Sequence, residues 1–169
     1  MKVANKSSPK GISHNEAEWL TALERYDLAP KLYEEGEGYI ISEYIEGDRI
    51  MGWIEKHDTE DIKNVLKEVL QQCRLLDKLK VNKKELQRPV KHIIISKSVK
   101  MIDFERAKRT DKPKNVTQFC QFLTSQNMKD LLEKKRIFLD KEKLIILLVE
   151  YKKEQSEKNF KKILNLLNS

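Results

Sequence analysis

The chain has 169 residues and a formal net charge of +7, a length that indicates a single domain. Hydrophobic residues make up 39% and charged residues 36%, a balance typical of a folded globular protein rather than a disordered one. No apolar run approaches the roughly 20 residues that a transmembrane helix needs, and the N-terminus lacks the apolar stretch of a signal peptide. These features exclude a membrane protein, and we expect a cytoplasmic location.

The two cysteines, Cys73 and Cys120, lie far apart in the sequence and fit no zinc-binding spacing. We therefore expect two free thiols in a reducing compartment. This excludes a secreted disulfide scaffold and a zinc-finger module.

The basic balance, with a pI near 9.2, favours an anionic partner such as a nucleic acid, a nucleotide or an acidic protein. The best-clustered basic side chains lie near the C-terminus: Lys152, Lys153, Lys158, Lys161 and Lys162. Lysines spread over helices usually only keep a surface hydrated, so nucleic-acid binding is left open here but is not favoured.

The N-terminal segment predicts a short strand over residues 1–6, a loop around residues 7–11 and then a helix. Ser13 with Glu16 three residues later forms the capping-box pattern that starts a helix. We expect this helix to run to about Tyr26, with Trp19 packed in the core.

Residues 31–33 and 39–45 read as two strands joined by a turn at residues 35–38. Gly36 and Gly38 in that turn lack a third glycine and no helix follows them, so they predict a hairpin turn and not a phosphate cradle.

The remaining sequence is predominantly helical. Apolar residues recur at helical spacing from residue 58 to about residue 80. Two short β-like runs, residues 92–95 and 99–102, are separated by a link of hairpin length. Four more helices are expected after Pro113, over residues 116–123, 128–136, 141–153 and 157–167.

The segment Ile102-Asp103-Phe104 places an acidic residue directly after a β-run. A carboxylate at that point can project into a cleft, and a phosphoryl-transfer enzyme needs such a carboxylate to hold the Mg²⁺ that bridges nucleotide phosphates. Taken alone, the aspartate equally fits a residue that only starts a turn.

Asp103 is not alone, because the order of segments resembles the protein kinase-like fold, and more narrowly the small archaeal predicted serine/threonine kinases related to the RIO and Bud-type kinases. Val3-Ala4-Asn5-Lys6 is similar to the strand whose lysine contacts the α- and β-phosphates, and Glu16 stands on the helix whose glutamate pairs with that lysine. Residues 39–47 resemble the strand and hinge that bind adenine through backbone groups, chiefly at Glu43 and Ile45.

By the same resemblance, residues 83–93 occupy the place of the catalytic loop and residues 102–105 that of the metal-binding Asp-Phe-Gly or Asp-Phe-Glu. The resemblance covers nearly the whole chain. It implies that Asp103 binds Mg²⁺ with help from His92, and that Glu85 positions the hydroxyl that accepts the phosphoryl group.

The fold implied by this resemblance is an α+β, two-lobed kinase-like domain. Residues 1–46 would form a minimal N-lobe of about three strands and one helix, and residues 47–169 a mostly helical C-lobe. The implied function is transfer of the γ-phosphoryl group of Mg-ATP to a serine or threonine of a protein substrate.

The sequence departs from the family pattern at three points. The glycine-rich loop is absent, since only five residues precede Lys6, which predicts weak or open nucleotide binding. Lys83-Lys84-Glu85 replaces the usual His-Arg-Asp or His-Gly-Asp, and Glu85 is one methylene longer than aspartate, a displacement that predicts low activity. His92 stands where an asparagine usually helps to hold the metal, although neutral imidazole prefers softer metals than Mg²⁺.

These departures keep a second interpretation open, in which the chain is a pseudokinase or binding module that uses the same fold to engage a protein or RNA. Each residue also has a purely structural interpretation: Lys6 as an ordinary terminal lysine, Glu16 as a capping glutamate and Glu85 as a solvated loop charge. The sequence alone indicates neither the oligomeric state nor the physiological substrate.

Overall fold

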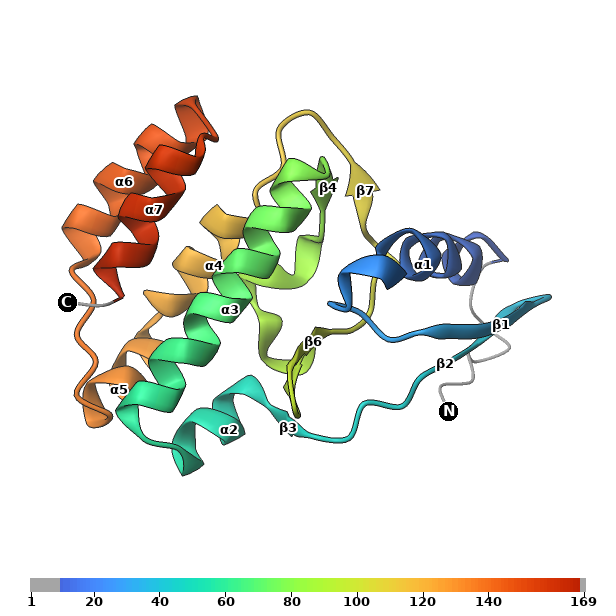
Figure 1. Cartoon of the computed structure of the whole chain (residues 1–169), viewed down its shortest axis with the longest axis horizontal. Coiled ribbons are helices and arrows are strands. Elements are labelled where there is room, and N and C mark those ends of the chain that lie inside the picture. The colour runs from blue at the N-terminus through green and yellow to red at the C-terminus, as the bar shows by residue number, and fades with distance from the viewer. Residues whose placement is uncertain (1–9, 168–169) are drawn as a thin grey trace.

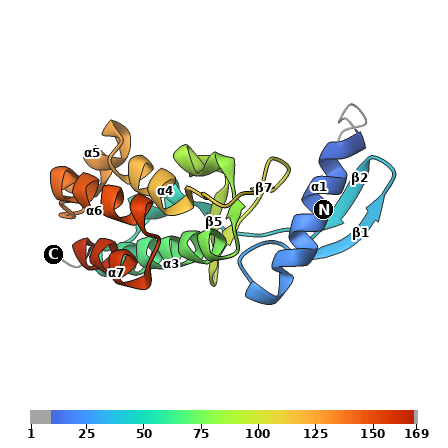
Figure 2. The ribbon, with the colours of Figure 1, turned by 90° about the horizontal axis from the view of Figure 1, so that it is seen from above.

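The computed structural model describes residues 10–167, which form a helix-rich α+β structure in two parts (Figure 1). The smaller part contains α1 (Lys10–Leu23), the short 3₁₀ helix η1 (Glu24–Tyr26) and the antiparallel pair β1 (Leu32–Gly36) and β2 (Tyr39–Ser42). Figure 2 shows the extended segment that follows β2 crossing from this part to the larger, helical part. The predicted α+β class is confirmed.

Helix α1 packs its apolar face on the β1–β2 hairpin. Ala17, Leu20 and Leu23 are buried in the common core, as the helical spacing predicts, and Ile40 of β2 is buried with them. Gly38 has a φ of +79°, a conformation that glycine adopts without steric cost. The predicted hairpin turn is therefore confirmed.

Two predicted boundaries in this part are wrong. The helix begins at Lys10, so Ser13 lies inside α1 and does not cap it; serine costs little within a helix and does not by itself stop one. The second strand ends at Ser42 and not at Ile45, because the chain leaves the hairpin there to reach the larger part. The predicted strand over residues 1–6 lies outside the described residues.

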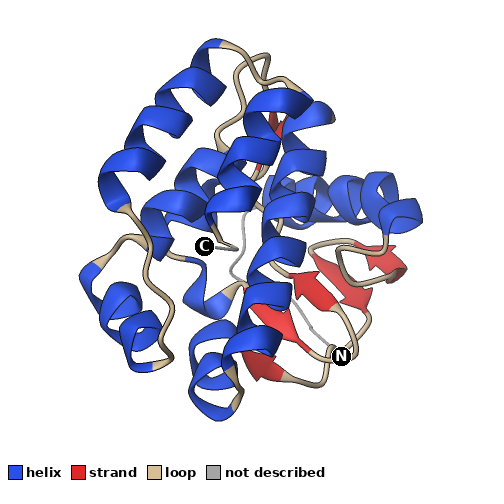
Figure 3. Cartoon of the chain, turned by 60° about the vertical axis from the view of Figure 1, so that its left-hand side comes forward, coloured by secondary structure: helices blue, strands red, loops and turns tan. Residues whose placement is uncertain are grey.

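The larger part consists of six helices, among the residues that the structure describes, packed around α3. Their bounds are α2 (Ile50–Lys56), α3 (Thr59–Lys78), α4 (Asn115–Leu123), α5 (Gln126–Lys134), α6 (Lys141–Lys153) and α7 (Glu157–Leu166). Asp58 caps α3 by accepting a hydrogen bond from the Asp61 N–H, with an N···O distance of 3.0 Å. Figure 3 shows that helices make up most of the chain, and the five helices predicted in this part are confirmed.

Short strands fill the space between the helices and the smaller part. β3 (Asp48–Arg49), β5 (Ile93–Ile95) and β6 (Val99–Met101) form an antiparallel sheet in the order β3-β5-β6, and β4 (Val81–Asn82) pairs with β7 (Lys108–Arg109). The predicted β5–β6 hairpin is confirmed. Two 3₁₀ helices, η2 (Lys84–Gln87) and η3 (Pro89–Lys91), lie between β4 and β5.

The first helix of the larger part, α2, and the strands β3, β4 and β7 were not predicted from the sequence. Two-residue strands are too short to show an alternating pattern. Gly47, the residue before β3, is required where it stands, because a Cβ there would lie 2.3 Å from the carbonyl oxygen of Ile95 in β5. Only glycine allows the chain to approach β5 that closely.

A buried polar network joins α3, α4 and α6. Asn115 donates to Asp77 Oδ1 from its Nδ2 at 2.7 Å and from its backbone N–H at 3.0 Å, and the Tyr151 hydroxyl donates to Asp77 Oδ2 at 2.9 Å. Arg74 Nη1 donates to the Tyr151 hydroxyl at 3.0 Å. Burial raises the pKa of Asp77 above its ordinary value, and these hydrogen bonds oppose that rise. The network therefore fixes how the three helices pack.

No helix within residues 10–167 is both long and apolar enough to cross a bilayer. The two cysteines form no disulfide in this part of the chain; both are buried, and burial raises the pKa of Cys120 to about 12. A thiol with such a pKa is not a nucleophile at neutral pH.

We predict that Asp77→Ala lowers the free energy of unfolding by about 3 kcal/mol, because it leaves buried donors of Asn115 and Tyr151 without an acceptor. Urea unfolding measures this change. The control is Asp61→Ala on the exposed start of the same helix, which should cost less than about 1 kcal/mol. Equal losses in the two variants would contradict the role of the network.

The raised pKa of Asp77 also predicts a pH dependence. A carboxyl whose folded-state pKa is raised contributes stability that is fully present below its ordinary pKa of 3.8 and is lost as the pH rises through the raised value. The unfolding free energy of the wild type minus that of Asp77→Asn should therefore fall as the pH rises from about 4. A difference that stays flat or rises would show that the carboxylate is not penalised by burial.

Candidate functional site

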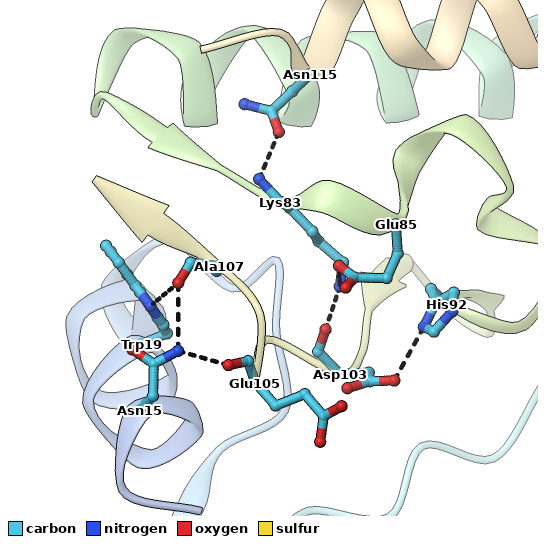
Figure 4. Close-up of polar contacts among 9 residues, drawn as sticks. All are labelled: Asn15, Trp19, Lys83, Glu85, His92, Asp103, Glu105, Ala107 and Asn115. Atoms are coloured by element: carbon cyan, nitrogen blue, oxygen red, sulfur yellow. Dashed lines mark hydrogen bonds and ion pairs between the residues drawn. The ribbon is translucent and has the colours of Figure 1, made fainter. Parts of the chain in front are cut away.

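Four polar residues of the larger part lie together at the start of the segment that links β6 to β7: Lys83, Glu85, His92 and Asp103 (Figure 4). Lys83 and Glu85 follow β4, His92 directly precedes β5, and Asp103 follows β6. The structure thus brings together the three carboxylate and imidazole residues that the sequence predicted for this site.

The β5–β6 hairpin places His92 beside Asp103. Ile93 is paired with Met101, and the Ile102 N–H donates to the His92 carbonyl at 2.9 Å. One residue beyond this pairing, His92 Nδ1 lies 3.2 Å from Asp103 Oδ2. The register of a short hairpin therefore fixes this His–Asp contact.

The backbone turns sharply at Asp103, which has a φ of +69°. Aspartate is one of the few residues with a side chain that tolerates the left-handed region. The turn directs the Asp103 carbonyl toward Lys83, while its carboxylate faces His92 (Figure 4). Such conformations occur often at functional sites.

Lys83 is the buried cation of the cluster, with an exposed fraction of 0%. Its ammonium group donates a hydrogen bond to the Asp103 carbonyl, lies 3.5 Å from Glu85 Oε2 and stands over the Phe104 ring, 4.4 Å from the ring centre. Burial lowers the pKa of Lys83, and the carboxylates of Glu85, Asp103 and Glu16 oppose that change. The side chain thus holds the turn at Asp103 and compensates the charge of Glu85.

Two carboxylate oxygens of the cluster are buried without a hydrogen-bond partner among the described residues: Glu85 Oε1 and Asp103 Oδ1. Buried oxygens of this kind are costly unless a cation or donor meets them. Mg²⁺ is usually held by one or two carboxylates together with waters and substrate phosphates. The Asp103 oxygen fits that role and the Glu85 oxygen remains for a proton donor, although residues 10–167 contain no group of three or more His, Cys, Asp or Glu side chains arranged around one metal position.

Helix α1 is attached directly to the segment that follows Asp103 (Figure 4). Asn15 Nδ2 donates to the Glu105 carbonyl at 2.6 Å and to the Ala107 carbonyl at 3.2 Å, and Trp19 Nε1 donates to the same Ala107 carbonyl at 3.0 Å. Trp19 is buried as predicted. These bonds couple the position of α1 to the conformation of the chain at Asp103.

Glu16 lies one residue after Asn15 and is also buried, with an exposed fraction of 7%. Its carboxylate opposes the lowering of the Lys83 pKa by burial, an interaction that the sequence did not predict. Lys6, the expected partner of Glu16, lies outside the described residues, and that pairing stays a prediction.

The expected adenine-binding residues lie on the extended segment after β2. Glu43 donates its backbone N–H to the Lys31 carbonyl at 2.8 Å, and its carboxylate accepts from the Lys31 N–H at 3.1 Å. No hydrogen bond within the described residues uses the backbone groups of Ile45. Among residues 10–167, therefore, the backbone N–H and carbonyl of Ile45 have no partner, whereas the Glu43 N–H is already used.

The sequence did not point to Lys83 or Asn15. A buried lysine has no sequence signature, since lysines are mostly exposed. The one signal that could have found Lys83 is its place two residues before Glu85, in the segment where the resemblance led us to expect a catalytic loop.

Comparisons with known proteins leave the family open. No protein-family model matches the chain. The chain is 29% identical over 105 residues to an uncharacterized protein, MJ1211, of the archaeon Methanocaldococcus jannaschii; the match covers 61% of this chain and 90% of that protein.

We predict that Lys83→Met lowers the free energy of unfolding by about 3 to 5 kcal/mol, because it leaves the Glu85 charge buried without its cation. The matched control is Lys84→Met, at the exposed neighbouring position, which should change stability by less than about 0.5 kcal/mol. Urea unfolding of both variants checks this.

A double-mutant cycle separates the charge pairing from simple packing. If Lys83 compensates Glu85, Glu85→Gln should cost much less in the Lys83→Met background than in the wild type, with a coupling of about 1 kcal/mol or more. Additive costs would mean that Lys83 does not act on Glu85.

Proposed function

We propose that the chain is a kinase-like phosphotransferase that transfers the γ-phosphoryl group of Mg-ATP to a serine or threonine hydroxyl of a protein. The observation that carries the proposal is the convergence of Glu85, His92 and Asp103 around Lys83, with unpartnered oxygens on Glu85 and Asp103. Carboxylate oxygens that are buried and have no hydrogen-bond partner among the described residues suit a site that handles cations and protons.

In this proposal each residue has a separate role in binding the metal or the nucleotide. Asp103 and His92 would hold the metal, whose contribution when bound is to neutralise phosphate charge. Ile45 would bind adenine with its backbone N–H and carbonyl, which no other described residue engages. Lys6 would steady the α- and β-phosphates, and Glu16 would orient Lys6, as the resemblance implies.

The transfer step assigns a proton role to Glu85. The hydroxyl oxygen of the acceptor bonds to the γ-phosphorus while the bond from that phosphorus to the β–γ bridging oxygen breaks, and ADP leaves with the electron pair. The hydroxyl proton passes to Glu85 Oε1, which is not engaged by another described group. Lys83 would act as a positioning residue, because it touches Glu85 and the Asp103 backbone.

The second candidate function is a pseudokinase that binds a partner without transferring phosphate. The position of the Lys83 ammonium favours it, since a resident cation beside Glu85 and Asp103 competes with a metal for the same charge. The two candidates differ in turnover and not in fold.

We expect Mg-ATP to stabilise the wild type against heat. A ligand at a hundredfold over its Kd stabilises by about 2.7 kcal/mol, which is an easily measured shift in Tm. Asp103→Asn should remove most of this shift. The matched control, Asp111→Asn at an exposed site outside the cluster, should keep it.

An unshifted wild type would exclude nucleotide binding. If the wild type shifts, radiolabel transfer to a generic protein substrate decides between the candidates. The proposed enzyme predicts transfer that Glu85→Gln reduces about a hundredfold or more while the thermal shift remains. A full shift without any transfer in the wild type would favour the pseudokinase.

A further inference from the structure

A basic hollow lies on the larger part, and its lining includes none of the four residues of the Lys83 cluster. It has a volume of about 620 Å³ and is formed by the chain between β7 and α4 on one side and the end of α6 on the other. Four lysines line it: Lys112, Lys114, Lys152 and Lys153. We infer that this hollow binds the phosphate backbone of a double-stranded nucleic acid.

The four lysines are exposed, and none has a carboxylate within ion-pair distance among the described residues. The one carboxylate of the lining, Asp111, accepts from Lys80 at 2.7 Å. The hollow therefore presents four uncompensated ammonium groups from segments about 40 residues apart in the sequence.

The two sides of the hollow are held together by partly buried hydrogen bonds. Gln155 Nε2 donates to the Pro113 carbonyl at 2.8 Å, and Arg74 Nη2 donates to the Gln155 carbonyl at 2.7 Å. The Lys114 N–H donates to Asn82 Oδ1 at 2.8 Å. These bonds fix the backbones from which the lysines project, so the charges are brought together before any ligand arrives.

The lysines that cluster near the C-terminus in the sequence fall into two groups in the structure, one close to glutamates and one lining the hollow. Lys162 is paired with Glu150 at 2.6 Å, and the charge of Lys161 acts on Glu157. Lys152 and Lys153 instead face the hollow with Lys112 and Lys114. The lysines of α7 are thus partly neutralised by glutamates, whereas Lys152 and Lys153 have no ion-pair partner among the described residues.

The chemistry of the lining selects the ligand. Lysine is a point charge that suits phosphate without reading base edges. The lining has no aromatic ring on which unpaired bases could stack and no arginine for bidentate contacts. A duplex backbone, which offers phosphates at regular spacing on its outside, matches this set, and DNA and RNA share that chemistry.

The test measures fluorescence anisotropy of duplexes of about 16 base pairs, one of DNA and one of RNA, titrated with the full chain without ATP. One variant changes Lys112, Lys114, Lys152 and Lys153 to Gln. The control variant removes the same charge from four exposed lysines elsewhere, Lys97, Lys134, Lys141 and Lys143.

We expect the hollow variant to lose about tenfold or more in affinity, and its salt slope to flatten by about one for each lysine that contacts a phosphate. The control should change affinity about threefold or less. Tighter binding to one of the two duplexes identifies the ligand as DNA or as RNA. Changing only the pair Lys112 and Lys114, or only Lys152 and Lys153, should give intermediate losses.

Equal losses in the two variants, an unchanged salt slope, or no binding by the wild type would overturn the inference. A labelled poly-glutamate that binds more tightly than both duplexes would also overturn it, in favour of an acidic protein. The inference does not depend on the proposed kinase function, because every measurement is made without ATP.

Discussion

The structure around the candidate site depends on one buried cation. The Lys83 ammonium donates to the Asp103 carbonyl, lies beside Glu85 and covers the Phe104 ring, so it connects the chain after β4 with the chain after β6. Its backbone N–H is held in turn by Asn115 at 2.8 Å, and Asn115 belongs to the Asp77 network that packs α3, α4 and α6. Asn115 therefore links the charge compensation at the site to the packing of the helices in the core.

The smaller part is joined to this arrangement at two places. Asn15 and Trp19 bind the carbonyls that follow Asp103, and the Met101 N–H donates to the Leu28 carbonyl at 2.8 Å while Lys100 binds Asp27. A shift of α1 would therefore pull on the turn at Asp103. This gives a physical route by which a partner that binds the smaller part could change the site.

The sequence predicts the parts of the fold that carry long periodic patterns and misses those that depend on tertiary contact. The helix α3 and the β5–β6 hairpin are predicted correctly, because each buries a regular set of apolar residues. The strands β3, β4 and β7 are missed, since two residues carry no period. Within the site, Asp103 is found from its place after a strand, whereas Lys83 is not, because only the fold shows that this lysine is buried. The kinase-like resemblance stays a proposal.

The central claim, that the Lys83 cluster is a Mg-ATP site, can be tested with the three histidines of the chain. Mn²⁺ in place of Mg²⁺ broadens the NMR signals of nearby nuclei, and the histidines lie in different surroundings: His92 touches Asp103, His14 contacts Glu35 and His57 stacks on Trp53. Adding Mn-ATP should broaden the His92 ring signals far more than those of His14 and His57, and Asp103→Asn should abolish the difference. Equal broadening of all three histidines, or none at His92, would contradict the claim.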